Sequence, residues 1–168
     1  MDLRKILDKL KKNRDFRKWK DKTDDAFFSY AFKIPQEMGP EEWQMGFYSR
    51  RRDKITTFVM KGESIEIKPE EEVFKQEGIK VYEIELDKIN LSLEDAIKKA
   101  DEFQKKNFPK DASVKTIAIL QNMPETGNIW NITYLTGSFN TLNMKISASS
   151  GKMVYHSLAS VFSFGKQN

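Results

Sequence analysis

The spacing of apolar residues changes from a helical period to a strand period twice along this chain. Residues 2–20 place apolar side chains three and four positions apart, which predicts a helix that bends or ends near Asn13. Residues 28–34 then alternate apolar with polar types, as a half-buried strand does. Such a unit can bury only one face of its sheet, so its helix is expected to cover that face.

Three further strands are predicted in the first half, and a connector follows them. The strands are residues 43–47, 54–60 and 65–67, and the basic run Arg50–Asp53 reads as a hairpin turn. Pro69 followed by three glutamates is typical of a helix start, because acidic side chains favour the positive end of the helix dipole. That helix is expected to end at Gly78, and a strand is predicted over 81–86.

The second half repeats this order. Ser92, with Asp95 three positions later, predicts the N-terminus of a helix that stops before Pro109. The tail after His156 keeps several apolar residues and is expected to pack on the fold. Strands are predicted at 113–121, 128–136, 139–148 and 152–156, with Gly, Ser and Pro in the connections between them.

These elements predict an α+β protein made of two tandem units. Each unit is a helix plus a four-stranded antiparallel meander, with residues 1–78 in the first and 79–168 in the second. The halves share a pattern and little residue identity. Their sheets could join edge to edge or pack face to face.

Three segments of the second half resemble the PepSY domain, a small cystatin-like α+β module. LSLEDAIKKA at Leu91–Ala100 resembles the opening of the family's helix, and IWNITY at Ile129–Tyr134 resembles its central strand. MKISASSGKMV at Met144–Val154 resembles its closing hairpin. The resemblance implies a non-enzymatic protein- or peptide-binding or regulatory module. It also allows the first half to be a second, diverged copy of the module, so that the two form a tandem pair.

Residue types that catalyse reactions or bind metals are scarce. The chain has no cysteine, which excludes disulfides, thiolate catalysis and cysteine-ligated metals. His156 is the single histidine, and a structural role is favoured for it over a base or a ligand. The acidic runs at 24–25, 41–42 and 70–72 are interpreted as solvated surface or helix caps. We therefore expect no enzymatic activity, no cofactor and no metal.

Positive charge is concentrated near the start of the chain. Residues 1–22 hold ten Lys or Arg against four Asp, an excess of six in a chain whose net charge is +4. With the hairpin tip, this predicts a surface for an acidic protein, nucleic acid or an anionic membrane. The alternative is an ordinary solvated helix face and a charged turn. The candidate residues are Lys11, Lys12, Arg14, Arg17, Lys18, Arg50, Arg51, Arg52 and Lys54.

The second half is polar without being charged. From Ala112 to Gly165, Asn, Ser and Thr dominate the strand positions that are expected to be exposed. Such a sheet can contact a partner through a face or an edge, or simply face solvent. Aromatic residues could line a small-molecule pocket between helix and sheet or belong to the core. The candidates for a ligand or peptide surface are Trp43, Phe47, Trp130, Asn131 and Tyr134.

Two functions remain as hypotheses. The first is a protein- or peptide-binding module, and the second is an adaptor for nucleic acid or an anionic surface. No segment approaches the roughly 20 apolar residues of a membrane span. The start of the chain does not resemble a signal peptide, which predicts a cytoplasmic location unless a leader has been removed. The identity of the partner and the oligomeric state are left open.

Overall fold

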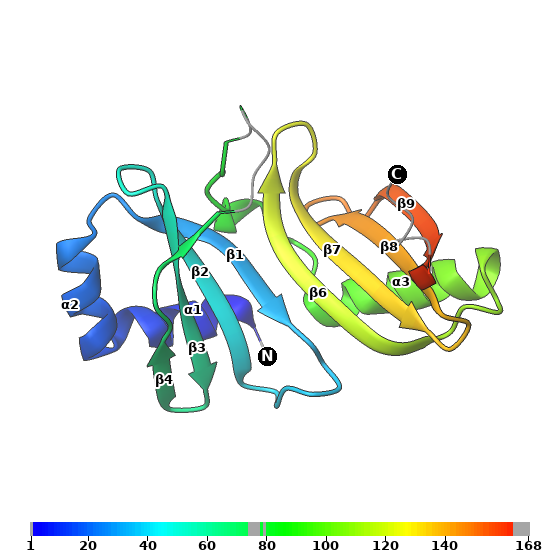
Figure 1. Ribbon diagram of the computed structural model, residues 1–168, viewed down its shortest axis with the longest axis horizontal. Coiled ribbons are helices and arrows are strands. Elements are labelled where there is room, and N and C mark those ends of the chain that lie inside the picture. Colours follow the sequence, from blue (N-terminus) through cyan, green and yellow to red (C-terminus); the bar gives the residue numbers. More distant parts are fainter. Residues whose placement is uncertain (1, 74–77, 79, 163–168) are drawn as a thin grey trace.

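The computed structural model describes residues 2–73, 78 and 80–162. Their strands form one antiparallel nine-stranded sheet in the order β4-β3-β2-β1-β6-β7-β8-β9, with β5 also beside β3 (Figure 1). The fold is therefore α+β, as predicted. The strands are β1 (Phe27–Lys33), β2 (Glu42–Ser49), β3 (Lys54–Lys61), β4 (Ser64–Ile67), β5 (Glu71–Glu72), β6 (Ser113–Met123), β7 (Gly127–Thr136), β8 (Asn140–Ser147) and β9 (Met153–Ser160).

The helices lie behind this sheet in the view of Figure 1 and leave its other face open. They are α1 (Leu3–Lys12), α2 (Arg14–Lys22) and α3 (Leu93–Asn107), with a short 3-10 turn, η1, at Leu86–Lys88. Buried residues of α1, α3 and strands from both halves belong to one hydrophobic cluster. The described chain therefore shares one core. None of its helices is long and apolar enough to cross a bilayer.

The predicted break near Asn13 is confirmed, and the residue itself explains it. Asn13 adopts an extended backbone, and its N–H donates to the Leu10 carbonyl at the end of α1. Its side-chain oxygen accepts hydrogen bonds from the N–H groups of Asp15 (2.8 Å) and Phe16 (3.1 Å), which start α2. Because one residue caps both helices, α2 can turn and pack its Phe16 and Trp19 rings against Phe58.

The two meanders join edge to edge, through β1 and β6. Tyr30 pairs with Gln121 and Phe32 with Ile119, and the intervening Ala31 pairs with Leu120. Ala31 and Leu120 are fully buried on the face beneath the helices. Pairing at this position removes one exposed edge from each meander and extends the core from one half into the other.

Two predicted elements between the halves are wrong. Glu71 and Glu72 do not begin a helix but form β5, paired with Ile55 and Lys54 of β3, and residues 74–77 and 79 lie outside the described residues. The predicted strand over 81–86 is also absent: the Ile84 N–H donates to the Phe28 carbonyl, but side chains occupy main-chain groups of the residues on either side of Ile84. Asn122 donates to the Glu83 carbonyl, and Asn128 exchanges two hydrogen bonds with the Glu85 backbone. Neither partner could be read from the local sequence.

The last strand also differs from expectation. β9 continues to Ser160, four residues past its predicted end at His156. The tail after His156 is held to the fold as predicted, since residues 157–160 pair with β8 and the Phe162 ring lies 5.8 Å from that of Phe139. Leu158 and Phe162 nevertheless keep 39% and 72% of their surface exposed. Phe164 lies outside the described residues.

Candidate binding surfaces

The basic hairpin tip is largely neutralised by acidic neighbours. Arg51 forms ion pairs with both Asp24 and Asp25, and Arg52 lies 2.7 Å from a Glu70 carboxylate oxygen. The Arg51 backbone N–H donates a hydrogen bond to the Asp25 carboxylate, and this effect is larger than that of desolvation. The pKa of Asp25 is therefore lowered, and its carboxylate stays charged. The predicted anion-binding tip therefore carries its own counter-charges. Its two remaining candidates are Arg50, whose guanidinium lies over the Phe27 ring, and half-buried Lys54.

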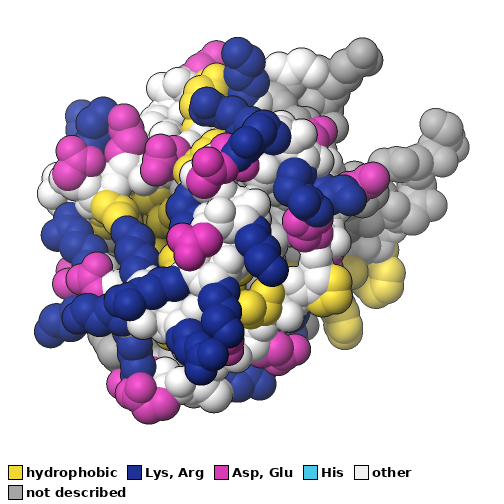
Figure 2. Space-filling model, turned by 90° about the vertical axis from the view of Figure 1, so that its left-hand side faces the viewer, with side chains coloured by type: hydrophobic (Ala, Val, Ile, Leu, Met, Phe, Trp, Pro, Cys, Tyr) yellow, Lys and Arg dark blue, Asp and Glu magenta, His cyan; other side chains and the backbone are white. Residues whose placement is uncertain are grey.

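The helical part of the predicted basic surface is different. Lys11, Lys12, Arg14 and Lys18 are exposed, and none of them forms an ion pair with another described residue. Arg17 uses its Nε to donate to the Lys11 carbonyl, which ties α2 to the end of α1. Figure 2 shows Lys and Arg side chains spread over the end of the molecule that carries α2, with Asp and Glu between them.

The five predicted ligand-surface residues do not form one surface. Phe47 is buried among the rings of Phe16, Phe28 and Phe58, and Tyr134 is buried with its hydroxyl donating to Asp101 (2.5 Å). Asn131 lies on the opposite sheet face from its neighbour Trp130, because successive strand residues point to opposite faces. Only Trp43 and Trp130 come together, with ring centroids 6.4 Å apart.

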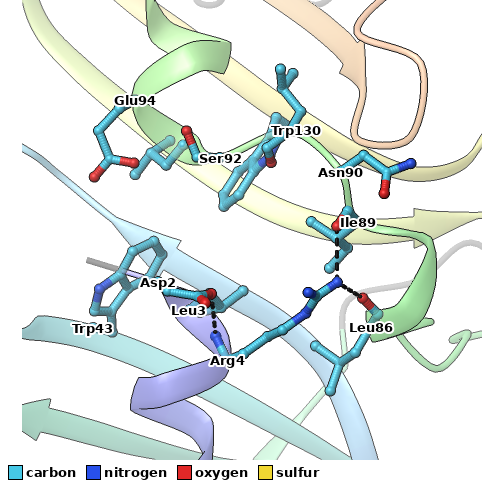
Figure 3. A pocket seen from close by; sticks show the side chains of 12 residues that line it. Asp2, Leu3, Arg4, Trp43, Leu86, Ile89, Asn90, Ser92, Glu94 and Trp130 are labelled. Atoms are coloured by element: carbon cyan, nitrogen blue, oxygen red, sulfur yellow. Dashed lines mark hydrogen bonds between the residues drawn. The ribbon is translucent and has the colours of Figure 1, made fainter.

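Those two tryptophans lie at a pocket of about 320 Å³ between the two halves (Figure 3). The start of α1 lines one side of it, and the segment from η1 into α3 lines the other. Arg4 links the two sides, since its guanidinium donates to the carbonyls of Leu86 (2.8 Å) and Ile89 (3.0 Å). The Trp130 indole N–H donates to the Leu91 carbonyl at 2.9 Å.

Most polar groups around this pocket already have structural roles. The Asp2 side chain caps α1, and the Ser92 hydroxyl caps α3. The two indoles are only 2% (Trp43) and 1% (Trp130) exposed, so little aromatic surface is open to a ligand. Lys33 lies over the Trp43 ring, with its ammonium 4.9 Å from the ring centroid. These contacts join the two halves at the pocket, and Trp43 and Trp130 are the members of the predicted aromatic pocket that the structure brings together there.

The outer edge of β9 was not singled out from the sequence. Among the described residues, no strand pairs with it. The Val161 N–H donates to Phe139 in the chain before β8, so strand alternation turns the main-chain groups of Leu158 and His156 outward. The strand, MVYHSLAS, contains no Lys, Arg, Asp or Glu. That absence of charge is the sequence signal that could have marked it.

His156 is exposed and lies beside the end of α3, and its structural role stays a prediction. Its ring lies 4.8 Å from the Phe103 ring and 6.2 Å from that of Phe108, where α3 meets β9. No group of three or more His, Cys, Asp or Glu in the described chain is arranged to hold a metal ion.

Comparison with known proteins gives a likeness of fold. No protein-family model matches the sequence, and no curated protein matches it. Among solved structures, a protein from Clostridium difficile 630, described as a lipoprotein candidate, aligns with a TM-score of 0.53. The alignment covers 86% of this chain and 90% of that chain, at 12% sequence identity. At that identity, what the two proteins have in common is the fold.

Proposed function

We propose that this protein is a non-enzymatic protein- or peptide-binding module of PepSY-like type, which takes an extended segment of a partner protein at the edge of β9. The observation that carries the proposal is this uncharged edge with outward main-chain groups. We also propose that α1 to β4 and α3 to β9 are tandem units, since each runs from helix into antiparallel meander. The division near residue 78 and the PepSY resemblance remain part of this proposal.

The physical argument rests on how sheets protect their edges. Natural edge strands are usually guarded by lysine, proline, bulges or a covering element, because unpaired N–H and C=O groups attract other strands. β9 contains no charge and no proline, and Val154, Tyr155 and Leu158 are exposed along it. An added strand would gain main-chain hydrogen bonds from Leu158 and His156 and apolar contacts on both faces. The matching partner is an extended, mostly uncharged segment with alternating apolar residues.

A photo-crosslinking residue placed at Val154 of the intact protein, expressed in its own cells, tests this proposal. Mass spectrometry should find partner peptides joined to β9. Leu158→Pro removes one outward N–H without removing a β8–β9 hydrogen bond, and should abolish the crosslinks. Leu158→Lys should do the same by charging the edge. The matched control is Ile67→Lys, which charges an equally exposed residue (40% against 39%) on β4, at the opposite end of the sheet.

Two results would contradict the proposal. One is crosslinking that persists unchanged in Leu158→Pro while the variant remains folded by circular dichroism. The other is crosslinking only to a second copy of the chain, with a dimer in light scattering, because β9 would then serve self-association.

The second candidate function is an anionic-surface adaptor, favoured by the four helical cations that form no ion pair with another described residue. It predicts binding to duplex DNA or to phosphatidylserine vesicles that weakens steeply with salt. Lys11→Glu with Lys12→Glu should abolish such binding. Arg51→Gln should weaken it far less, because Asp24 and Asp25 already neutralise Arg51. Equal loss in both variants, or binding insensitive to salt, would exclude this mode.

A further inference from the structure

A shallow groove crosses the junction of β1 and β6 on the face of the sheet opposite the helices. Its volume is about 330 Å³. This open face carries Tyr30, Gln121 and Asn131. Ala31 and Leu120 lie on the other face of the sheet, in the core. We call the hollow the seam groove. It is lined by Tyr30, Phe32, Gln44, Ile119 and Gln121.

The groove exists because the Tyr30 side chain is held aside. Its ring lies across Gly46 of the neighbouring strand, so closely that a Cβ on Gly46 would fall 1.9 Å from the ring. The Tyr30 hydroxyl reaches beyond β2 and hydrogen-bonds with Thr57 on β3 at 2.6 Å. Because the Tyr30 ring leans over β2, it leaves open the space above β1 and β6 that it would otherwise fill. The ring is fixed in place before any ligand arrives, which lowers the entropic cost of binding.

Two amide groups at this groove have no hydrogen-bond partner in the described chain. They belong to Gln44 and Gln121, both half-buried. Each amide offers two donor hydrogens and an acceptor oxygen. The amides of Gln36 and Gln104, by contrast, are bonded to Thr116 and to the Phe108 carbonyl. The groove thus combines aromatic surface with unused neutral hydrogen-bonding groups.

The neutral polar surface continues from the groove across β7 and β8. Asn131 is the register neighbour of Ile119, and it accepts a hydrogen bond from Asn143 at 2.6 Å. The same Asn143 amide donates to Thr133 at 2.9 Å, so these groups are held in order. Two cations on this face already have contacts: Lys115 pairs with Glu37, and Lys145 lies over the Tyr155 ring.

We propose that the seam groove binds one ring of a neutral oligosaccharide, whose next sugars lie over Asn131 and Asn143. A sugar ring has an apolar C–H face that can pack on Tyr30 and Phe32, and its hydroxyls match amide donors and acceptors. A nucleic acid or an acidic sugar would need cations to neutralise it, and the five lining residues are uncharged. This site goes beyond the proposed strand-binding function and uses a different part of the sheet.

The test is a titration of the ¹⁵N-labelled full chain with maltotetraose, cellotetraose and N-acetylchitotetraose, followed by NMR. At least one sugar should shift the side-chain amide signals of Gln44 and Gln121, with a Kd on the order of 1 mM. Gln121→Ala and Phe32→Ala should each weaken that binding by about tenfold. Ile67→Ala, which truncates an exposed apolar residue on the edge strand β4, should leave the Kd unchanged.

Three results would overturn the proposal. The first is that none of the three sugars shifts either glutamine. The second is that binding persists at full strength in both groove variants. The third is that an oligonucleotide or an acidic tetrasaccharide binds more tightly than any neutral sugar. If Phe32→Ala fails to fold, Gln121→Glu replaces it, because it keeps the side-chain length and should still weaken the binding.

Discussion

Replacing Gly46 by alanine tests how the Tyr30 ring is held across the sheet. The new Cβ would lie 1.9, 2.2 and 2.7 Å from three ring atoms, so the ring must swing away and lose its hydrogen bond to Thr57. That bond is worth about 1 kcal/mol net. Overpacking the contact costs about 1–3 kcal/mol more. Gly46 is not among the glycines with positive φ, so alanine returns about 0.5–1 kcal/mol by restricting the unfolded chain.

The expected net loss is therefore about 2 kcal/mol in the free energy of unfolding. Urea denaturation followed by tryptophan fluorescence measures it, and Tm should fall by about 4–8 °C for a chain of this size. Tyr30→Ala removes the clash, so in that background Gly46→Ala should be neutral or slightly stabilising. The resulting coupling energy should be about 2 kcal/mol. Strictly additive effects in this double-mutant cycle would refute the account of the ring.

Three further predictions concern stability. Asn13→Ala should lower the free energy of unfolding by about 1 kcal/mol, measured in urea, whereas Asn13→Asp should be nearly neutral because it keeps the N-cap acceptor. The lowered pKa of Asp25 contributes stability that is present above the ordinary value of 3.8 and is lost as pH falls through the folded-state pKa. Asp25→Asn should therefore make the free energy of unfolding less dependent on pH in acid, as measured by urea denaturation at a series of pH values. Burial, helped by hydrogen bonding to Asp101, raises the pKa of Tyr134, so the contribution of this group to stability is complete below pH 10.0 and is lost as pH rises above that value. Tyr134→Phe should weaken this pH dependence in alkaline denaturation. An unchanged alkaline profile would argue against the prediction.

Elements whose signals are local could be predicted from the sequence. Ser92 caps α3, as expected, because a hydroxyl beside the first turn needs no distant partner. The hairpin turn at 50–53 and the alternation in β7 were equally readable. Glu71–Glu72 was misread, because pairing with Lys54 and Ile55 outweighed a local helix preference. Residues 81–86 were misread because Asn122 and Asn128, about forty positions later, supply hydrogen bonds to the backbone of Glu83 and Glu85.

The candidate surfaces divide in the same way. Composition was enough to locate the basic segment and the uncharged second half. It could not reveal that Asp24, Asp25 and Glu70 neutralise the arginines of the hairpin, since these acids meet it only in the folded chain. It also missed the seam groove. One signal was available there: Gly46 sits inside a strand, where glycine often marks the close approach of another group.

The sequence by itself determined the helices, most of the strands and the neutral character of the sheet in the second half, because hydrophobic period, caps and residue type act over a few positions. Only the tertiary structure decided that the two meanders meet at β1 and β6, and with that meeting came one core, the contact between Trp43 and Trp130, and the seam groove. The physical reason is that two sheets join only where each has an edge strand with unpaired main-chain groups and a complementary shape. Those edges are formed by parts of the chain that are distant in sequence.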